Sequence, residues 1–322
     1  MSDIINEYVE IDCFQNLLIE IIKYQGINTF IPGGCWPWKF AIHYDNEAIV
    51  IENNEIISSN LLKKTIGISY QYERIEHGKK NIEIIGRCLD KDNDFIILGV
   101  DQYFIPYQKP SIYMKKHGNH TLVLYGGLVN GKVKCVSSIP QYKGELDIES
   151  LQKAIDSSYL ESWKVNIDFT HKRETDRKSL LDWFFNSFDV HNYYDEFNKK
   201  KREVNTAKLY EIFDELRRNN DLKHFCDGTW GWSLHKRGKI LLYFLAKMTR
   251  NIEWLKEISN ITEKIDCTWK ILYRKIYMKT LSETVCNWET IDFLFEKILE
   301  SERVLRKKIF ANRDSMYKEN GY

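Results

Sequence analysis

Residues 120–137, HTLVLYGGLVNGKVKCVS, decide the fold of the first half of the chain. Two apolar runs within them, Thr121–Tyr125 and Lys132–Ser137, are separated by a stretch that contains three glycines. Runs rich in β-branched and aromatic residues favour strands, and glycines between two such runs favour a turn. The segment therefore predicts a β-hairpin that begins at His120 and ends at Ser137.

The same strand signal recurs upstream of this hairpin. Runs rich in Ile, Val, Tyr and Phe, bounded by Asn, Asp or Gly, predict strands at Ala48–Ile51, Ile82–Gly86 and Phe95–Phe104. All five prolines and twelve of the sixteen glycines lie within residues 1–144. Because proline and glycine mark turns and end helices, we expect the first half to be built from strands and turns.

Helical periodicity replaces the strand signal from Leu146 onward. Apolar residues recur three and four positions apart in four stretches: Leu151–Ile155, Leu180–Phe185, Ile240–Met248 and Ile291–Ile298. The chain is therefore expected to be an α+β protein, with a first domain over residues 1–160 and an all-helical domain over 161–322.

The bulk composition is typical of a globular protein, with 43% hydrophobic and 29% charged residues. A net charge of +1 gives no reason to expect a nucleic-acid or membrane-surface partner. No apolar run approaches the roughly 18 residues that span a bilayer, and residues 1–12 lack the order of a signal peptide. We therefore expect a cytoplasmic protein whose seven cysteines, none in CxxC spacing, are reduced thiols rather than zinc ligands or disulfides.

A helix with a reactive cysteine at its start is predicted near the N-terminus. Asp12 and Gln15 have the spacing of a capping box, and apolar residues follow at Phe14, Leu17, Leu18, Ile21 and Ile22, with Gly26 as a stop. Cys13 would then lie in the first turn, where unpaired N–H groups and the positive helix end favour a thiolate. The same N–H groups could hold an oxyanion. A small buried core residue is the alternative role for Cys13.

The histidine expected to serve Cys13 is His120, which enters its strand directly after a Gly-Asn turn. A cysteine at a helix start, followed about a hundred residues later by a histidine on a strand, is the papain-like order. His117 is the competing base, and we expect it to be solvated beside two lysines. Cys35, in a loop of glycine, proline and tryptophan, is the competing nucleophile, although it has no helix start to acidify it.

Several segments share their order and spacing with a known family: Asp12–Leu18, Tyr24–Ile27, Pro32–Gly34, Val100–Tyr107, His120–Gly126 and Leu146–Ala154. Over residues 10–155 the chain resembles the N-terminal domain of the butirosin-biosynthesis acyltransferase (BtrH) family, which includes papain-like amide synthases of thiotemplated pathways. The resemblance implies a papain-like fold and an acyl group held on Cys13. It further implies a carrier-protein thioester as the donor, with its phosphopantetheine arm as part of the substrate, and an amine as the acceptor.

The third member of the implied catalytic site departs from the family pattern. The family usually carries Asp or Asn in the strand after the histidine strand, and here Ser137 lies near that position. A serine can accept from an imidazole N–H but stabilises an imidazolium less than a carboxylate does. Either the site works as a dyad, or its activity is altered, or Asp101 on a neighbouring strand substitutes. A structural Asp101 that binds backbone N–H groups of the following turn is an equal alternative.

The sequence thus predicts acyl transfer in natural-product biosynthesis. Cys13 would attack the thioester, and His120 would take the thiol proton and later deprotonate the amine. A thioesterase or cysteine peptidase would use the same residues with water as acceptor, and a non-catalytic binding module would keep only the fold. An acidic carrier protein is the expected partner, and the basic runs Lys199–Arg202 and Arg303–Lys308 offer a docking face. No cofactor or metal is expected.

Overall fold

The computed structural model describes residues 17–18, 20–22, 41–45, 48–52, 59–75, 86, 95–137, 142–158, 162–172, 174–188, 194–195, 200–201, 206–219, 222, 237–282 and 287–322. The chain divides into two compact units. The sheet unit comprises Glu10–Thr29 and Ser58–Glu174, and the helical unit comprises Met1–Val9, Phe30–Ile57 and Thr175–Tyr322.

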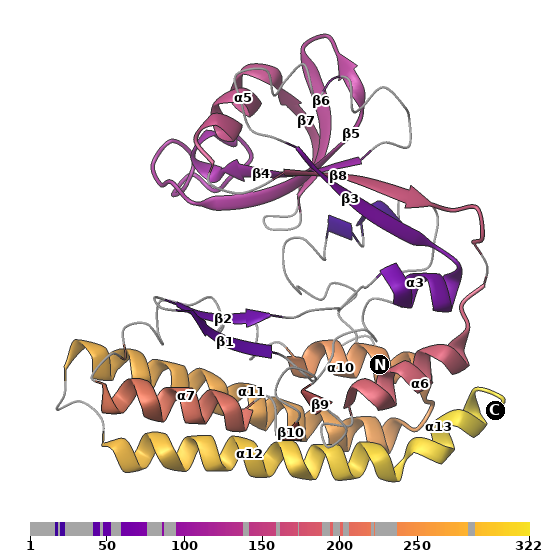
Figure 1. The fold of residues 1–322 in the computed structure, drawn as a ribbon, viewed down its shortest axis with the longest axis vertical. Helices are drawn as coiled ribbons and strands as arrows, with labels where there is room; N and C mark the ends of the chain where they lie inside the picture. The colour runs from indigo at the N-terminus through magenta and orange to yellow at the C-terminus, as the bar shows by residue number, and fades with distance from the viewer. Residues whose placement is uncertain are drawn as a thin grey trace. The chain divides into compact units, whose positions relative to one another are not determined.

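The sheet unit is organised around six antiparallel strands (Figure 1). In spatial order they are β3 (Ser69–Ile75), β8 (Ser162–Asp168), β4 (Phe95–Asp101), β5 (Asn119–Val129), β6 (Lys132–Ser137) and β7 (Tyr142–Asp147). All residues of β4 are buried, which fits a strand at the centre of the sheet. β6 instead alternates between exposed and buried positions, as expected where one face packs on a core.

The β5–β6 hairpin has the position predicted from the sequence, but its turn lies later than the first glycines. Asn130 and Gly131 both have positive φ, 52° and 73°, the conformation of a two-residue hairpin turn. Gly126 and Gly127 also have positive φ, and the pairing with β6 shifts between Tyr125 and Leu128. These two glycines therefore form a β-bulge within the strand.

One face of the sheet packs against α5 (Ile148–Asp156). Asp147 begins this helix by accepting a hydrogen bond from the Ser150 N–H at 2.8 Å. Apolar side chains of the helix then join those of the central strands in one buried cluster: Ile96, Leu98, Val100, Leu122, Leu124, Val133, Cys135, Leu151, Ala154 and Ile155. The apolar face that the sequence periodicity predicts for this helix is therefore the face that packs on the sheet and closes this core.

α3 (Ser59–Ile66) leads into β3 through a glycine that the local geometry requires. Gly67 has φ of 72°, and its N–H donates to the Lys63 carbonyl at 3.2 Å. A Cβ on Gly67 would meet the His171 carbonyl oxygen at 1.8 Å. Both the left-handed backbone and this close approach exclude a side chain at the helix end.

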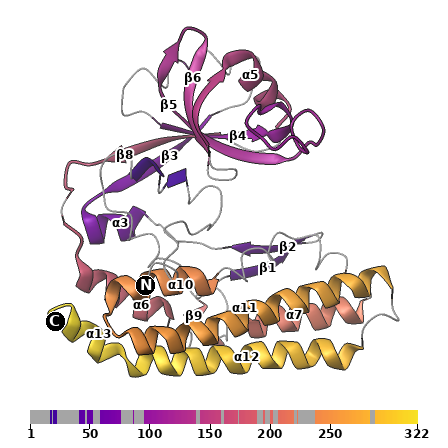
Figure 2. The same ribbon diagram turned by 180° about the vertical axis from the view of Figure 1, so that it is seen from behind.

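The helical unit contains a short antiparallel hairpin, β1 (Ala41–Asp45) with β2 (Ala48–Glu52), and a two-residue pair, β9 (Tyr194–Asp195) with β10 (Lys200–Lys201). Its described helices are α6 (Arg177–Phe188), α7 (Thr206–Arg218), α10 (Arg237–Met248), α11 (Ile252–Leu281), α12 (Trp288–Ala311) and α13 (Arg313–Glu319). The long helices α11 and α12 run side by side in both views (Figures 1 and 2). Trp269 of α11 and Phe295 of α12 are aromatic members of their shared core, and Phe213 of α7 packs on Phe295.

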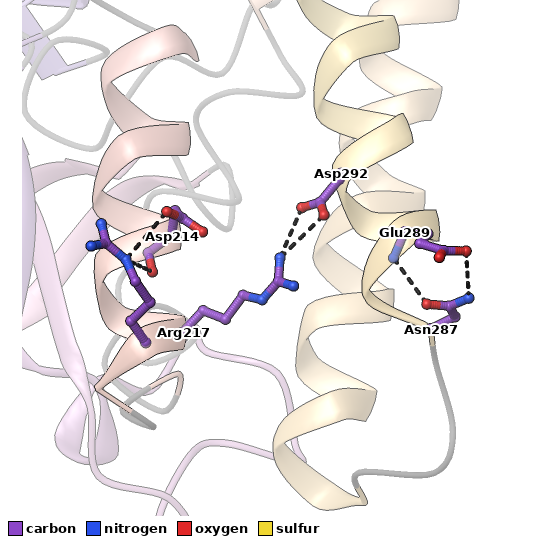
Figure 3. A network of polar contacts seen from close by, with 6 residues as sticks. Asp214, Arg217, Asn287, Glu289 and Asp292 are labelled. Carbon is purple, nitrogen blue, oxygen red and sulfur yellow. Dashed lines mark hydrogen bonds and ion pairs between the residues drawn. The ribbon is translucent and has the colours of Figure 1, made fainter.

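Polar contacts tie α7 to α12 on the surface of this unit (Figure 3). Arg217 donates from one guanidinium nitrogen to both carboxylate oxygens of Asp292, at 3.1 and 3.2 Å. The same guanidinium lies 4.5 Å from the centroid of the Trp288 ring. Asn287 begins α12 by accepting from the Glu289 N–H at 3.0 Å.

The structure confirms the α+β class, with a six-stranded antiparallel sheet and a helical C-terminal region. The division into units differs from the predicted one at residue 160, because β8 pairs with β3 and β4 while β1 and β2 belong to the helical unit. The predicted strand Ile82–Gly86 lies outside the described residues except for Gly86, which is helical, so the prediction is wrong there. None of the described helices combines the length and the hydropathy of a bilayer-spanning segment.

Candidate active site

The sheet end of the β5–β6 hairpin holds a buried histidine beside two hydroxyl groups. His120 is the second residue of β5, and Ser137 is the last residue of β6. Ser137 Oγ lies 3.1 Å from His120 Nε2, and the Tyr107 hydroxyl lies 3.2 Å from the same nitrogen. The structure therefore brings the predicted histidine and the predicted serine together and adds a tyrosine.

Burial governs the ionisation of this His120 cluster, defined as His120, Ser137 and Tyr107. His120 is only 5% exposed, and burial lowers its pKa to about 4. Burial also raises the pKa of Tyr107 well above its usual value, so its phenol stays protonated. Because both described partners are uncharged hydroxyls, neither provides the charge that would stabilise an imidazolium. At neutral pH the cluster is a neutral imidazole between two hydroxyls.

The tyrosine of this cluster is itself fixed by the sheet. Its ring stacks on Tyr142 of β7, with centroids 4.0 Å apart and planes 11° from parallel. Both rings pack against the core beneath α5. Nε2 of His120 therefore faces two hydroxyls, that of Ser137 on β6 and that of a tyrosine packed against β7. The hydrogen bonds that His120 makes with described residues both use Nε2, which leaves Nδ1 for a different partner.

Asp101 does not join the His120 cluster. Its strand does neighbour that of His120, as predicted, because Val100 of β4 pairs with His120 and Asp101 pairs with Asn119. One carboxylate oxygen accepts from the Tyr103 N–H at 3.0 Å and from the Gly118 N–H at 3.1 Å. The other accepts from the Ser157 hydroxyl at 2.7 Å and lies 2.6 Å from His117 Nδ1.

These four contacts keep Asp101 ionised. Burial by itself would raise the pKa of Asp101, but the hydrogen bonds from His117, Tyr103, Ser157 and Gly118 outweigh it and lower the pKa to about 2. The structure thus answers the alternatives for Asp101 in part. It accepts from one backbone N–H of the following turn, that of Tyr103, and from the Gly118 N–H before β5, and its histidine partner is His117 rather than His120.

His117 lies at the surface, with 66% of its side chain exposed. Its ring stacks on Tyr103, with centroids 4.2 Å apart and planes 5° from parallel, and meets Phe104 edge-on at 6.3 Å. The expectation of a solvated histidine is therefore confirmed, but its ring is held by an aromatic face and a buried carboxylate. Sequence reasoning missed this pair because Asp101 and His117 are joined by loop geometry, which has no periodic signal.

The opposite face of the sheet meets the predicted first helix. Residues 17, 18 and 20–22 are helical, and Leu17, Leu18, Ile21 and Ile22 are buried, which confirms this part of the predicted helix. A cavity of about 170 Å³ is lined by Glu20, Ile21, Phe95, Val123, Tyr125, Val136 and Lys143. Its β5 members alternate with the leucines that face α5, so it lies on the face opposite to the His120 side chain.

Both candidate nucleophiles, Cys13 and Cys35, lie outside the described residues, so the predicted pairing of Cys13 with His120 stays a prediction. Two other thiols are described. Cys135 is buried in the core, and burial raises its pKa to about 12, whereas Cys267 on α11 is exposed. Cys135 is therefore a core residue, and Cys267 is a reference for an ordinary surface thiol.

The basic run Arg303–Lys308, expected to offer a docking face, is partly neutralised. Arg303 pairs with Glu300 at 3.4 Å, and Lys308 pairs with Glu257 of α11. Within the part of the chain that the structure describes, no three His, Cys, Asp or Glu side chains come close enough together to hold a metal ion.

No protein-family model matches the chain, and a search of curated proteins gives no significant match. The likeness to the BtrH family is therefore a resemblance between short segments.

Proposed function

We propose that this chain is a cysteine-dependent acyltransferase with a papain-like first domain. Cys13 attacks the carbonyl carbon of a carrier-protein thioester, and the phosphopantetheine thiol leaves. His120 transfers the thiol proton of Cys13 to that leaving group. An amine then attacks the acyl-S-Cys13 intermediate and forms an amide, which restores the thiolate.

The observation that carries this proposal is the contact between His120 and Ser137 on adjacent strands. In a cysteine–histidine site one ring nitrogen serves the thiol while the other is held by a third group. Here Nε2 is held by Ser137 and Tyr107, which leaves Nδ1 to face the thiol. If Nε2–H donates to a hydroxyl, Nδ1 carries the lone pair that a base requires.

The low basicity of His120 defines how the first step must run. An imidazole with a pKa near 4 does not hold a proton at neutral pH, so no stable thiolate–imidazolium pair forms through the described groups. The proton must pass on to the leaving thiolate within the same step. The helix start at Cys13 then has to supply part of the activation by favouring the thiolate.

The proposal also makes a demand on the position of Cys13. Glu20 and Ile21 line the sheet face opposite to His120. Seven helical residues correspond to about 10 Å along a helix axis. Cys13 must therefore reach past the end of the sheet, where β5 begins, for its thiol to meet His120 Nδ1.

The decisive experiment is acylation by a small acyl thioester, followed by intact-protein mass spectrometry and peptide mapping. The wild-type protein should gain one acyl group on Cys13, and Cys13→Ala should gain none. Cys267→Ala, which removes an exposed thiol remote from the site in sequence, should acylate like the wild type. An adduct that persists in Cys13→Ala would overturn the assignment. Product analysis with and without an added amine separates transfer from hydrolysis.

The predicted proximity of Cys13 to His120 can be tested independently of any acylation. In His120→Cys, mild oxidation should yield a disulfide between residues 13 and 120, because a bridge needs Cα atoms about 4.4–6.8 Å apart. Peptide mapping identifies the bridge. Recovery of residue 120 as a reduced thiol or bridged elsewhere would contradict the required geometry.

A non-catalytic binding module is the second candidate, and the environment of His120 is the observation that favours it. A buried histidine with a pKa near 4 and no carboxylate partner is also what a site that has lost its chemistry would keep. Iodoacetamide labelling distinguishes the two. An acyltransferase should label at Cys13 at least ten times faster than at Cys267, whereas equal rates at the two thiols would support the binding module.

A further inference from the structure

The second half of α11 presents apolar side chains to solvent. Four of them are between 37% and 65% exposed: Ile271, Tyr277, Met278 and Leu281. Lys270 and Arg274 are exposed among them, and all six recur at three- and four-residue steps along one side of the helix. That side lies opposite to the buried Trp269, Leu272 and Ile276. We call these six exposed residues the basic stripe.

The clustering of these side chains is informative, because single exposed apolar residues are common on any surface. Twelve large hydrophobic side chains are exposed in the described part of the chain, and five of them lie within residues 271–293. A contiguous apolar patch that a folded unit leaves uncovered is typical of an interaction surface.

The charge of this half of α11 has a single sign. Residues 267–281 contain four basic side chains and no acidic one. Lys279 lies 4.8 Å from the centroid of the Trp288 ring, a cation–π contact within the same unit. Among the described residues, no carboxylate pairs with Lys270 or Arg274. The basic stripe therefore offers two exposed cations to an acidic surface.

The first half of α12 presents the opposite charge. Its exposed positions follow the same helical spacing and define an acidic stripe: Glu289, Phe293, Glu296 and Glu300. Phe293 is 61% exposed within that stripe. Glu300 is paired with Arg303 at 3.4 Å, whereas Glu296 has no ion-pair partner among the described residues. The acidic stripe is therefore an apolar side chain flanked by anions.

The two stripes belong to neighbouring antiparallel helices of one unit. α11 ends at Leu281 and α12 begins at Trp288, so both stripes start at the same end of the helix pair, which runs side by side in Figure 2. An anionic membrane or a nucleic acid would be attracted by the basic stripe and repelled by the acidic stripe beside it. A partner that fits both stripes must carry both signs of charge, and a second copy of this chain does.

We propose that α11 and α12 form a self-association surface, in which the basic stripe of each protomer lies on the acidic stripe of its partner. A two-fold axis brings the surface onto its own copy, so both contacts form at once. The apolar side chains of the two stripes meet at the centre, and the charges surround them. This surface is independent of the chemistry proposed for the sheet unit.

The length of the two stripes sets the strength that we expect. Each spans about 20 Å of helix, and two adjacent helices are about 20 Å wide, which gives a footprint of roughly 400 Å² on each protomer. A standard interface buries about 800 Å² per partner. The dimer should therefore be weak, with a Kd in the micromolar range, and it should be favoured by low salt.

Sedimentation velocity on the full chain tests the proposal, at protein concentrations from about 1 to about 300 µM. The mean mass should rise toward twice that of one chain. Raising the ionic strength from about 0.05 to about 0.5 M should move this rise to higher protein concentration. A chain that stays monomeric over the whole range overturns the proposal. Binding of such a monomer to vesicles that contain phosphatidylserine would assign the basic stripe to a membrane instead.

Two charge reversals identify the surface. Arg274→Glu sets like charges against the acidic stripe, and Glu296→Lys sets them against the basic stripe, so each variant alone should raise the Kd about tenfold. An equimolar mixture of the two should associate within about threefold of the wild type, because each reversed charge then faces its complement. Lys109→Glu, which reverses an exposed charge on the sheet unit, should leave the Kd unchanged.

Phe293→Ser tests the apolar centre of the surface. It should also raise the Kd about tenfold, while the urea midpoint of the dilute protein stays that of the wild type, because this side chain is exposed in the monomer. Dimers that persist unchanged in both charge variants, or a mixture that associates no better than its components, would overturn the pairing of the stripes. If a reversal variant does not fold, the salt dependence of the wild type and the Kd of Phe293→Ser decide the question.

Discussion

His117 and His120 are separated by two residues and occupy opposite environments. His120 is buried between hydroxyls and is neutral, whereas His117 is exposed and bonded to a buried carboxylate. The start of β5 at Asn119 produces this difference, because His120 lies within the sheet and His117 stays in the loop before it.

The comparison shows that fixing a histidine within a strand does not by itself stabilise the charged form of its imidazole. The β5–β6 hairpin gives His120 a rigid setting, but a rigid apolar setting lowers the pKa of an imidazole. The loop gives His117 less burial but places its ring beside the charge of Asp101 at the end of β4.

The largest expected loss of stability comes from removing the carboxylate of Asp101, which binds the exposed His117. Asp101→Ala leaves two backbone N–H groups, the Ser157 hydroxyl and His117 without their acceptor. We expect the free energy of unfolding to fall by about 4 kcal/mol, measured by urea denaturation monitored on the sheet unit. Asp147→Ala, which removes one exposed cap of α5, should lose only about 1 kcal/mol. Equal losses in the two variants would show that Asp101 stabilises the protein no more than an exposed helix cap does.

The next effect is a pH dependence that belongs to the buried histidine. His120 titrates near 4 in the folded state and near 6.5 when unfolded, so the unfolded state binds more protons between these values. Stability is therefore fully present above pH 6.5 and is lost as the pH falls toward 4, by about 3 kcal/mol at most. The pKa of Asp101 is also lowered, but its contribution to stability is lost only as the pH falls from about 3.8 to about 2.

Urea midpoints measured from pH 8 to pH 4 test this assignment. The slope between pH 6.5 and 4 should be clearly smaller in His120→Gln than in the wild type, whatever the absolute stability of the variant. His171→Asn should keep the wild-type slope. A wild-type protein whose stability is flat across this window would show that His120 is not the buried neutral group described above.

Much of the sheet could be predicted from its sequence, because central strands carry a strong local signal. The runs at Thr121–Tyr125 and Lys132–Ser137 lie in β5 and β6. The run predicted at Phe95–Phe104 is strand β4 only as far as Asp101, and the prediction is wrong at Gln102–Phe104, which form a 3-10 helix. The strands β3, β7 and β8 were not predicted. In β8, Trp163, Val165 and Ile167 alternate with polar residues, which is the period of a strand. Longer helical patterns on both sides of this segment outweigh that signal.

The candidate site was predictable only where it follows the sheet. The pairing of His120 with Ser137 follows from the register of one hairpin. Tyr107 comes from the turn after β4 and reaches His120 through tertiary packing, for which spacing gives no signal. The pairing of Asp101 with His117 depends on how one loop folds back, as the hydrogen bond between the Gln102 N–H and the Gly118 carbonyl shows.

A carboxylate in place of Ser137 would give His120 an anionic partner, as Asp101 already does for His117. Ser137→Asp should raise the pKa of His120 above its present value of about 4 by one to three units, because an ionised partner stabilises the imidazolium. Titration of the imidazole C–H resonances by NMR measures it. Ser137→Ala should leave the pKa low, since Tyr107 remains uncharged. An unchanged pKa in Ser137→Asp would mean that burial alone determines the pKa of His120.

The smallest effect is expected from Tyr107→Phe, because Nε2 carries a single hydrogen or lone pair for two hydroxyls. The ring would keep its stacking on Tyr142, and Ser137 would take over the bond, so the loss should be about 0.5 kcal/mol. Tyr142→Phe, which removes a hydroxyl that makes an exposed hydrogen bond, is the matched control and should be close to neutral.

The double variant gives a larger effect. Combined with Ser137→Ala, Tyr107→Phe leaves His120 Nε2 buried without a described partner, so the double variant should lose about 1 kcal/mol more than the two single losses together. Strict additivity would mean that the two hydroxyls do not share one nitrogen, and that His120 is held by something other than this cluster.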